Sequence, residues 1–480
     1  MRRRADLKTG TTCNSNCVFC VIGDHLFTGD RTTEACIAEL RESRKTCVDV
    51  VFTGAEVSIR PDFFQLVRAA KRLGYERIQI QTNGRIFVYR EFCERTVAAG
   101  ANEFSPSIHG HVAKLHDGLT RAPGSFAQIV TAIEHMVALG VPVVSNTVIT
   151  KQNAKHLPEL ATMLVALGVT QFQLAFPHPT GHAATYFGGV VPRMSEIAPL
   201  VHAALDIGRA AGVVCMAEAM PFCMMRGHEH QVAELHIPPT EIVYDGYVVP
   251  DYAADRMDRG KVRFTQCGAC RFEPICEGPW KQYPQGLGDA EFVPVSGARV
   301  IDPRVILDER FAMLGEPAPS AMPGAGWRAV CFVPAAGSPA CTAELCSLNA
   351  AQPSLGARGI AVIVVSPDDP TLQRAWAAQH GTAEVMMVAD GDRRLATLWR
   401  ALAPGGAWRR SSYLVDPNGR VAHVMVEVDT AHHGAQIAYA YDRLHAPARP
   451  LGVAHDLVTL RRAVLQPPAE PPAEPPQGSA

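Results

Sequence analysis

The chain has 480 residues, of which 47% are hydrophobic, and a formal net charge of −2. This length predicts roughly three domains. The balanced charge, without a basic run interleaved with aromatics, argues against a nucleic-acid partner. Neither an apolar run of about 18 residues nor a lipid-binding amphipathic segment indicates a membrane partner.

The first motif is TTCNSNCVFCVIGD, in which Cys13, Cys17 and Cys20 lie within eight residues. A structural zinc site normally has four protein ligands, and a disulfide framework would need an oxidising compartment. The first residues lack the apolar core of a signal peptide, so we expect a cytoplasmic protein with reduced thiols. Three close thiolates suit an iron-sulfur cluster that leaves one iron open to a non-protein ligand.

The C-x3-C-x2-C spacing, with Phe19 before the third cysteine, resembles the signature of radical S-adenosylmethionine (SAM) enzymes. The resemblance implies that Cys13, Cys17 and Cys20 hold three irons of a 4Fe-4S cluster, with Phe19 beside the cofactor. The fourth iron would chelate the amino and carboxylate groups of SAM. Reductive cleavage of SAM would then give a 5′-deoxyadenosyl radical that abstracts hydrogen from a substrate. From the spacing alone, a zinc knuckle is an alternative interpretation.

Apolar strand-like runs then alternate with segments of helical period. They cover residues 48–54, 62–75, 77–84, 90–100, 103–110, 125–140, 142–150, 157–168 and 170–181. Such alternation predicts parallel strands with helical crossovers. We therefore expect an α/β fold whose first domain, residues 1–210, is a partial (β/α)6 barrel of the TIM type. Its active site would lie at the carboxyl ends of the strands.

Three of these strand ends resemble cofactor-binding positions of radical SAM enzymes. TGAEV, with Gly54, Ala55 and Glu56, resembles the GGE motif, although Ala55 replaces the second glycine. The resemblance implies that this backbone and the Glu56 carboxylate receive the SAM amino group, and that Ser107 and Asn146 reach the ribose. The alternative is that Ser107 and Asn146 only cap strands or bind turn backbone.

A second cysteine group, Cys267, Cys270 and Cys276, has C-x2-C-x5-C spacing, and zinc is an open alternative to iron there. After a radical SAM barrel it resembles the auxiliary-cluster region called SPASM or, in its shorter form, twitch, here over residues 211–300. The full pattern has a further cysteine where this chain has Trp280. The resemblance therefore implies one auxiliary 4Fe-4S cluster.

The remaining cysteines before residue 300 have less specific surroundings. Cys223 is a candidate fourth ligand of the auxiliary cluster, and a buried structural cysteine is an equal alternative. The upstream hairpin pattern of SPASM is also incomplete, since Gly246 is followed by Asp251. The apolar surroundings of the others predict core positions, and these are Cys36, Cys47, Cys93 and Cys215.

The resemblance to SPASM and twitch enzymes also implies partners. Most such enzymes modify peptides or proteins, and a minority act on small molecules. The substrate is therefore expected to be a peptide or protein, as for a maturase. An electron donor such as flavodoxin or ferredoxin is implied as well.

After a Pro/Gly/Ala-rich segment that predicts a linker over residues 301–324, the chain changes character. Pro334, Ser338 and Cys341 form a P-x3-S-x2-C arrangement that resembles the peroxiredoxin active site. If Ser338 is the N-cap and Pro339 the first helical residue, Cys341 lies in the first turn. There the free amides and the helix dipole favour a thiolate.

Residues 325–450 keep a thioredoxin-like order of strands and helices, with a hairpin turn at Asn418 and Gly419. The domain resembles AhpC/TSA peroxiredoxins of the bacterioferritin-comigratory type. This implies that Arg410, or else Arg409, holds the thiolate and the peroxide, and that Cys346 is the resolving cysteine. An inactive thioredoxin-like fold and a buried Cys346 are the alternatives.

The Pro-rich residues 451–480 are predicted to be disordered. Two functions are compatible with all these motifs. The first is a radical SAM enzyme with a fused thiol peroxidase, which would need a thiol reductant such as thioredoxin. The second is a redox sensor, or a relay of electrons and disulfides, without radical chemistry.

Overall fold

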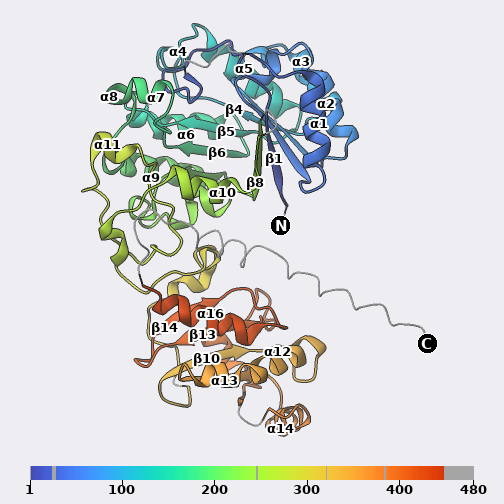
Figure 1. Cartoon of the computed structure of the whole chain (residues 1–480), viewed down its shortest axis with the longest axis vertical. Coiled ribbons are helices and arrows are strands. Elements are labelled where there is room, and N and C mark those ends of the chain that lie inside the picture. The colour runs from blue at the N-terminus through green and yellow to red at the C-terminus, as the bar shows by residue number, and fades with distance from the viewer. Residues whose placement is uncertain (1, 24–28, 245–246, 321, 383–384, 448–480) are drawn as a thin grey trace, which may run out of the picture. The chain divides into compact units, whose positions relative to one another are not determined.

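The computed structural model describes residues 2–23, 29–244, 247–320, 322–382 and 385–447 (Figure 1). These residues divide into two compact units. Unit 1 runs to Phe264 and resumes over Glu277–Phe292, whereas unit 2 takes Thr265–Cys276 and the chain from Val293 onward. The predicted tail 451–480 and Gly246 lie outside the described residues.

Unit 1 is built on parallel strands that follow one another in chain order. β1 (Arg4–Lys8), β2 (Asp49–Thr53), β3 (Arg77–Thr82) and β4 (Glu103–Pro106) pair side by side. β5 (Val144–Val148), β6 (Gln171–Ala175) and β7 (Val214–Glu218) form a second parallel run. The bridges Phe104–Val143 and Ser107–Asn146 join the two runs. The predicted α/β fold of parallel strands with helical crossovers is therefore confirmed, although these two runs contain seven strands where six were expected.

Helices connect these strands and cover the outer face of the sheet (Figure 1). They are α1 (Thr33–Ser43), α2 (Phe63–Arg72), α3 (Arg90–Ala99), α4 (Ala113–Thr120), α5 (Ser125–Ala138), α6 (Leu157–Ala166) and α9 (Met194–Ala210). Val50 and Phe52 of β2 are completely buried, as are other alternate residues of the strands. Successive side chains of a strand point to opposite faces, so the other face is free to carry polar groups.

The polar face of the sheet is linked by contacts between neighbouring strands. Gln79 of β3 donates to Glu103 of β4 at 2.7 Å, and Thr53 of β2 donates to Asp6 of β1. Gln173 of β6 donates to Glu218 of β7. The interior of the partial barrel is therefore lined by paired hydrophilic side chains.

The remaining elements of unit 1 are short. β8 (Thr240–Tyr244) pairs with β1 in parallel, and β9 (Tyr247–Val249) pairs with β8 in antiparallel orientation. The short helices are α7 (His182–Thr185), α8 (Phe187–Val190), α10 (Tyr252–Asp255) and α11 (Tyr283–Leu287). No helix in the described part of the chain is both long and apolar enough to cross a membrane.

Unit 2 contains a five-stranded sheet in the order β12-β11-β10-β13-β14. Its strands are β10 (Trp327–Phe332), β11 (Ile360–Ser366), β12 (Met386–Ala389), β13 (Ser411–Val415) and β14 (Val421–Met425). β10, β11 and β12 are parallel, whereas β13 and β14 form the predicted antiparallel hairpin. This is the expected thioredoxin-like arrangement.

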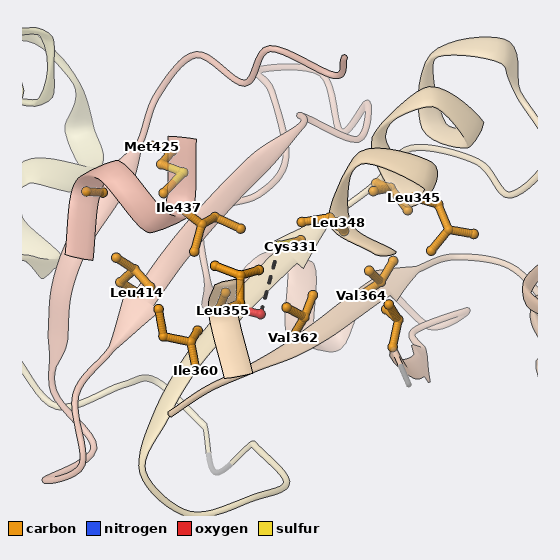
Figure 2. Packing of buried hydrophobic residues seen from close by; sticks show 14 of the residues in the cluster. Cys331, Leu345, Leu348, Leu355, Ile360, Val362, Val364, Leu414, Met425 and Ile437 are labelled. Carbon is orange, nitrogen blue, oxygen red and sulfur yellow. Dashed lines mark hydrogen bonds between the residues drawn. The ribbon is translucent and has the colours of Figure 1, made fainter. Parts of the chain in front are cut away.

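The helices of unit 2 pack on this sheet through an apolar core. They are α12 (Pro339–Ala350), α13 (Gln352–Gly356), α14 (Pro370–Gln379), α15 (Arg394–Leu398) and α16 (His433–His445). Figure 2 shows Leu345 and Leu348 of α12 and Ile437 of α16 near Val362 and Val364 of β11. The same core therefore fixes both α12 and α16.

The segment predicted as a linker packs against the hairpin of unit 2. It forms two 3-10 helices, Pro303–Leu307 and Glu309–Met313. The backbone of Ala318 donates to Gly419 O at 2.8 Å, and buried Arg310 donates to Ser411 Oγ at 2.8 Å. Composition alone predicts flexibility here, but the backbone amides of the segment find partners on an edge strand.

Candidate active sites

The first cysteine loop begins directly after β1 and is held against the end of β2. Ala55 N donates to Gly10 O and Glu56 N donates to Thr12 O, both at 3.0 Å. Gly54 has φ of 112°, and a Cβ there would lie 2.7 Å from Gly10 O. The close approach of the two backbones therefore depends on a glycine at position 54, because any side chain there would separate them.

Phe19 anchors the cysteine loop to the protein core. Its ring is 7% exposed and packs with Leu119, Ala183 and Val190. The ring of His109 lies edge-on to it, with 4.6 Å between centroids. The structure thus places Phe19 in apolar packing that positions the loop, and contact with a cofactor stays a prediction.

The loop after β6 holds the other end of the cysteine loop. His182 N donates to Cys20 O, and His182 Nδ1 lies at hydrogen-bonding distance from Cys17 O, both at 2.9 Å. A Cβ on Gly181, whose φ is 53°, would lie 2.4 Å from Cys20 O. The approach of these two loops therefore depends on a glycine at position 181.

Asn83, which follows β3, reaches the first cysteine. Its Nδ2 lies 3.8 Å from Cys13 Sγ and donates to Asn14 Oδ1 at 2.6 Å. Arg85 also donates to Asn14 O. The residue types alone did not single out Asn83 or His182. A polar residue at the carboxyl end of a parallel strand was the available signal.

The Glu56 carboxylate ties the end of β2 to the end of β3. It accepts hydrogen bonds from Thr82 Oγ1 at 2.7 Å, from Asn83 N at 2.6 Å and from Ser58 N at 3.2 Å. Burial raises the pKa of Glu56. The carboxylate therefore has a structural task here, and its expected contact with the SAM amino group stays a prediction.

Ser107 and Asn146 lie opposite each other where β4 and β5 meet. Ser107 N donates to Thr82 O at 2.9 Å, and Ile108 N donates to Asn146 O at 3.0 Å. The backbones thus serve strand pairing. Asn146 Oδ1, however, is buried and has no hydrogen-bond partner among the described residues. A buried amide oxygen of this kind is suited to a ligand, because buried polar groups are rarely left unpaired.

The three thiols of the loop are chemically suited to an iron-sulfur cluster. All three are partly exposed, and burial raises the pKa of Cys13 to about 11. No three His, Cys, Asp or Glu side chains of the described residues converge as they would around one metal ion. Convergence on one point is not required, because each cysteine of a 4Fe-4S cluster binds a separate iron.

The thiol site of unit 2 lies at the start of α12. Ser338 is the N-cap, its Oγ accepts from Cys341 N at 3.3 Å, and Pro339 is the first helical residue. The predicted capping is therefore confirmed. Cys341 is 1% exposed, and Arg410 Nη2 lies 3.2 Å from its Sγ. Arg409 instead contacts Glu309 at 3.2 Å, so the structure selects Arg410.

Two further residues complete this site, and sequence reasoning missed both. Arg410 Nη1 donates to Glu344 Oε2, and His433 Nδ1 lies 2.9 Å from Glu344 Oε1. The side chains of Glu344 and His433 are completely buried. The position of Glu344, three residues after Cys341 on one helix, was an available signal. Nothing local in the sequence indicated His433.

Family models match both ends of the chain. Residues 7–164 match the Radical SAM superfamily, and residues 319–424 match the AhpC/TSA family. The chain joins a radical SAM domain to a peroxiredoxin-like domain. The radical SAM domain contains the cysteine loop, and the peroxiredoxin-like domain contains Cys341.

Curated relatives resemble the radical SAM domain. An AdoMet-dependent heme synthase of Methanosarcina barkeri is 30% identical over 174 residues, which cover 35% of this chain and 49% of that protein. A probable GTP 3',8-cyclase of Saccharolobus solfataricus is 28% identical over 177 residues, covering 35% of this chain and 55% of that protein. The chain thus spans about half the length of the curated relatives it matches.

Two solved structures are similar to portions of the chain. Streptococcus suis SuiB bound to S-adenosylmethionine has a TM-score of 0.47 and 16% identity, covering 62% of this chain and 77% of that chain. Xanthomonas campestris Peroxiredoxin Q has a TM-score of 0.24 and 28% identity, covering 25% of this chain and 80% of that chain.

In the peroxiredoxin-like domain, Cys341 and Cys346 share helix α12. Cys341 is buried and Cys346 is exposed, so the alternative of a buried Cys346 is wrong. Residues five apart in an α-helix have Cα atoms about 8 to 9 Å apart, beyond the span of a disulfide. A Cys341–Cys346 bond would therefore require α12 to unwind.

The second cysteine group has a defined backbone. Cys270 N donates to Cys267 O at 2.9 Å, and Val295 N donates to Cys270 Sγ at 3.4 Å. Cys276 N donates to Phe272 O at 2.8 Å. The three cysteines are partly exposed and belong to unit 2. An auxiliary cluster on them stays a prediction.

The other cysteines divide by burial. Cys223 is partly exposed and belongs to unit 1, in the 3-10 helix Phe222–Met224. Its role as a ligand also stays a prediction. The predicted core positions are confirmed, since the four cysteines in question are buried, namely Cys36, Cys47, Cys93 and Cys215.

Proposed function

We propose that the chain is a radical SAM enzyme that cleaves SAM reductively and abstracts hydrogen from a peptide or protein substrate. The observation that carries this proposal is the attachment of the cysteine loop to the ends of β2, β3 and β6. Cys13, Cys17 and Cys20 would hold a 4Fe-4S cluster, which supplies the electron that breaks the sulfonium bond of SAM. A flavodoxin or ferredoxin would deliver that electron.

The chain's own residues would position the cofactor and the substrate. Asn83 holds the loop close to Cys13 Sγ, and the unpartnered Asn146 Oδ1 is available to accept a hydrogen bond from a bound SAM. Glu56 keeps the ends of β2 and β3 together. The polar pairs that line the partial barrel favour a hydrophilic substrate, because displaced polar contacts must be replaced.

SAM cleavage is tested by anaerobic reconstitution of the full chain, followed by reduction with dithionite in the presence of SAM. We expect 5′-deoxyadenosine, measured by liquid chromatography and mass spectrometry. A reconstituted chain that binds iron but forms no 5′-deoxyadenosine would contradict the proposal. That result would favour the redox sensor or relay function instead.

We further propose a second 4Fe-4S cluster on Cys267, Cys270 and Cys276. Its support is the spacing and chemistry of the thiols. The reconstituted chain should then contain about eight irons, four for each three-cysteine group. Zinc at the second group, with about four irons in total, would overturn this part.

We also propose that the peroxiredoxin-like domain reduces peroxides with Cys341. Its support is the 3.2 Å contact between Arg410 and Cys341 Sγ in the first turn of α12. The thiolate attacks one peroxide oxygen, an S–O bond forms, and the O–O bond breaks to release water after proton uptake. Arg410 and the helix amides stabilise the negative charge on sulfur and on the leaving oxygen.

The cycle would close through Cys346 and an external thiol. The sulfenic acid on Cys341 condenses with Cys346, losing water and forming a disulfide once α12 opens. A thiol reductant such as thioredoxin then reduces this disulfide. After one equivalent of peroxide, mass spectrometry should show a Cys341–Cys346 disulfide, and a sulfenate or a more oxidised Cys341 in Cys346→Ala. Full peroxide consumption by Cys341→Ala would remove the peroxidase function.

A further inference from the structure

His433 is the first residue of α16, and its imidazole is completely buried beside the Glu344 carboxylate. His433 Nδ1 and Glu344 Oε1 lie 2.9 Å apart. Neither atom has an aligned hydrogen-bond partner among the described residues. Because an unpaired carboxylate oxygen is costly to bury, the nearby ring nitrogen is the group that can satisfy it after a small rotation of the ring.

From Glu344 the contacts continue to the reactive sulfur. The other carboxylate oxygen accepts from Arg410 Nη1, and Arg410 Nη2 lies 3.2 Å from Cys341 Sγ. A guanidinium is a planar fork, so holding one nitrogen fixes the direction of the other. The orientation of Glu344 therefore sets the position of the positive charge beside Cys341.

The backbone keeps His433 in this place. Gly434 N donates to Ser347 Oγ of α12 at 3.2 Å. A Cβ on Gly434 would lie 2.2 Å from the Ala351 Cβ. The start of α16 is thus pressed against α12, and the imidazole has little room to withdraw from Glu344.

Three charged groups surround His433, one from each packed segment. They are Glu344 on α12, Arg410 before β13 and Asp429 before α16. Burial, assisted by Arg410 and opposed by Asp429, lowers the pKa of His433 to about 3. This direction favours the neutral ring, whose Nδ1 lies 2.9 Å from Glu344 Oε1, so a proton on Nδ1 can be donated to the carboxylate.

We propose that His433 is a positioning residue of the thiol site, which orients Glu344 and thereby fixes Arg410 against Cys341. The effect of His433 on peroxide turnover rests on the proposed peroxidase function. The effect of His433 on the reactivity of the Cys341 thiol does not. The two can therefore be tested separately.

The test uses the full chain and three substitutions of His433. Asn places an amide nitrogen near the position of Nδ1, Gln places it near Nε2, and Leu removes both. His432→Asn is the matched control, since the His432 side chain is exposed and pairs with Asp429 rather than with Glu344. The pH dependence of Cys341 alkylation by iodoacetamide, followed on its peptide by mass spectrometry, reports the thiolate. Stopped-flow measurement of peroxide consumption reports the chemical step.

We expect His433→Leu and His433→Gln to raise the pH midpoint of alkylation. They should also slow the peroxide reaction about tenfold, as for loss of a hydrogen bond to a charged group. His433→Asn should restore both values close to wild type, and condensation of the Cys341 sulfenate with Cys346 should keep its rate. His432→Asn should change nothing.

Equal alkylation midpoints in the wild type, His433→Leu and His433→Gln would overturn the proposal. If His433→Leu fails to fold, the comparison of Asn with Gln decides, and equal behaviour of these two overturns it. If the wild-type chain consumes no peroxide, the peroxidase function fails. The alkylation midpoints then still decide the role of His433.

Discussion

The cysteine loop of unit 1 and the Cys341 site of unit 2 hold their thiols by different means. In the loop, the backbone carbonyls of the cysteines are held, Cys20 O by the backbone N–H of His182 and Cys17 O by contact with its Nδ1. Burial there raises the pKa of Cys13 to about 11. In unit 2 the guanidinium of Arg410 lies 3.2 Å from Cys341 Sγ, at a helix N-terminus.

This difference separates two ways of obtaining a thiolate. The loop provides position, and its thiols become ligands when a metal replaces their protons. The helix site instead places the guanidinium of Arg410 and the free amides of the first helical turn beside its sulfur. The first site should therefore depend on a cofactor and the second on the charged side chains around it.

The largest expected effect is the loss of one ligand of the loop. Cys17→Ala should abolish formation of 5′-deoxyadenosine, because SAM binds the open iron of a cluster that three thiols must hold. Iron content and 5′-deoxyadenosine are measured after anaerobic reconstitution. Cys36→Ala, at a buried cysteine outside the loop, is the control and should keep both. Full SAM cleavage by Cys17→Ala would contradict the view that the loop acts through a cluster held by its three thiols.

Removal of iron should next separate the two sites within one molecule. After its iron is oxidised and removed by a chelator, the chain should lose SAM cleavage entirely. The second-order rate constant of Cys341 with hydrogen peroxide should stay within about twofold, because Arg410 and the helix amides, and no metal, act on its sulfur. Peroxide consumption is followed with the same preparation before and after chelation. A parallel loss of both activities would show that the thiol site also depends on metal.

A smaller effect is expected from the loop contact at Gly181. Gly181→Ala would place a Cβ 2.4 Å from Cys20 O, so the loop must shift and iron binding should weaken several-fold. Gly212→Ala is the control, because it also has positive φ, at 71°, but open space around it. Both variants place a Cβ at positive φ, so Gly212→Ala controls for strain of that kind. Equal iron retention by Gly181→Ala and Gly212→Ala would mean that the close approach of Gly181 to Cys20 O does not affect iron binding.

The smallest expected effect is a loss of folding stability of unit 2 at acidic pH. Burial lowers the pKa of His433 to about 3 from an ordinary value of 6.5. Between these two values, His433 is protonated in the unfolded chain and neutral in the folded chain. This contribution to stability is complete above pH 6.5 and falls as the pH drops toward 3. The urea midpoint of unit 2 should therefore fall in this window, and by less in His433→Asn.

Tryptophan fluorescence measures this midpoint well, because four of the five tryptophans, namely Trp327, Trp376, Trp399 and Trp408, lie in unit 2. His423, whose pKa burial lowers to about 4, contributes in the same direction and remains in both proteins. The difference between wild type and variant is therefore the diagnostic quantity. An identical acid dependence would show that His433 is not held neutral.

Local pattern was enough to predict much of both sites. The spacing of Cys13, Cys17 and Cys20 and the alternation that follows indicated a thiol loop at the edge of parallel strands. Ser338 and Pro339 indicated the helix start that carries Cys341. These features depend on residues within one turn or one strand, where capping and side-chain period are set by neighbours in the chain.

The partners of these residues were decided only by the tertiary structure. His182 contacts Cys17 O across 165 positions of sequence, and Arg410 reaches Cys341 across 69. Such contacts exist because strands far apart in the chain end at one edge, and because α16 packs on α12. By itself, the sequence determined which chemical groups are present and where each element begins. Only packing selected Arg410 over Arg409 and brought His433 to Glu344, because buried polar groups must find partners wherever the fold places them.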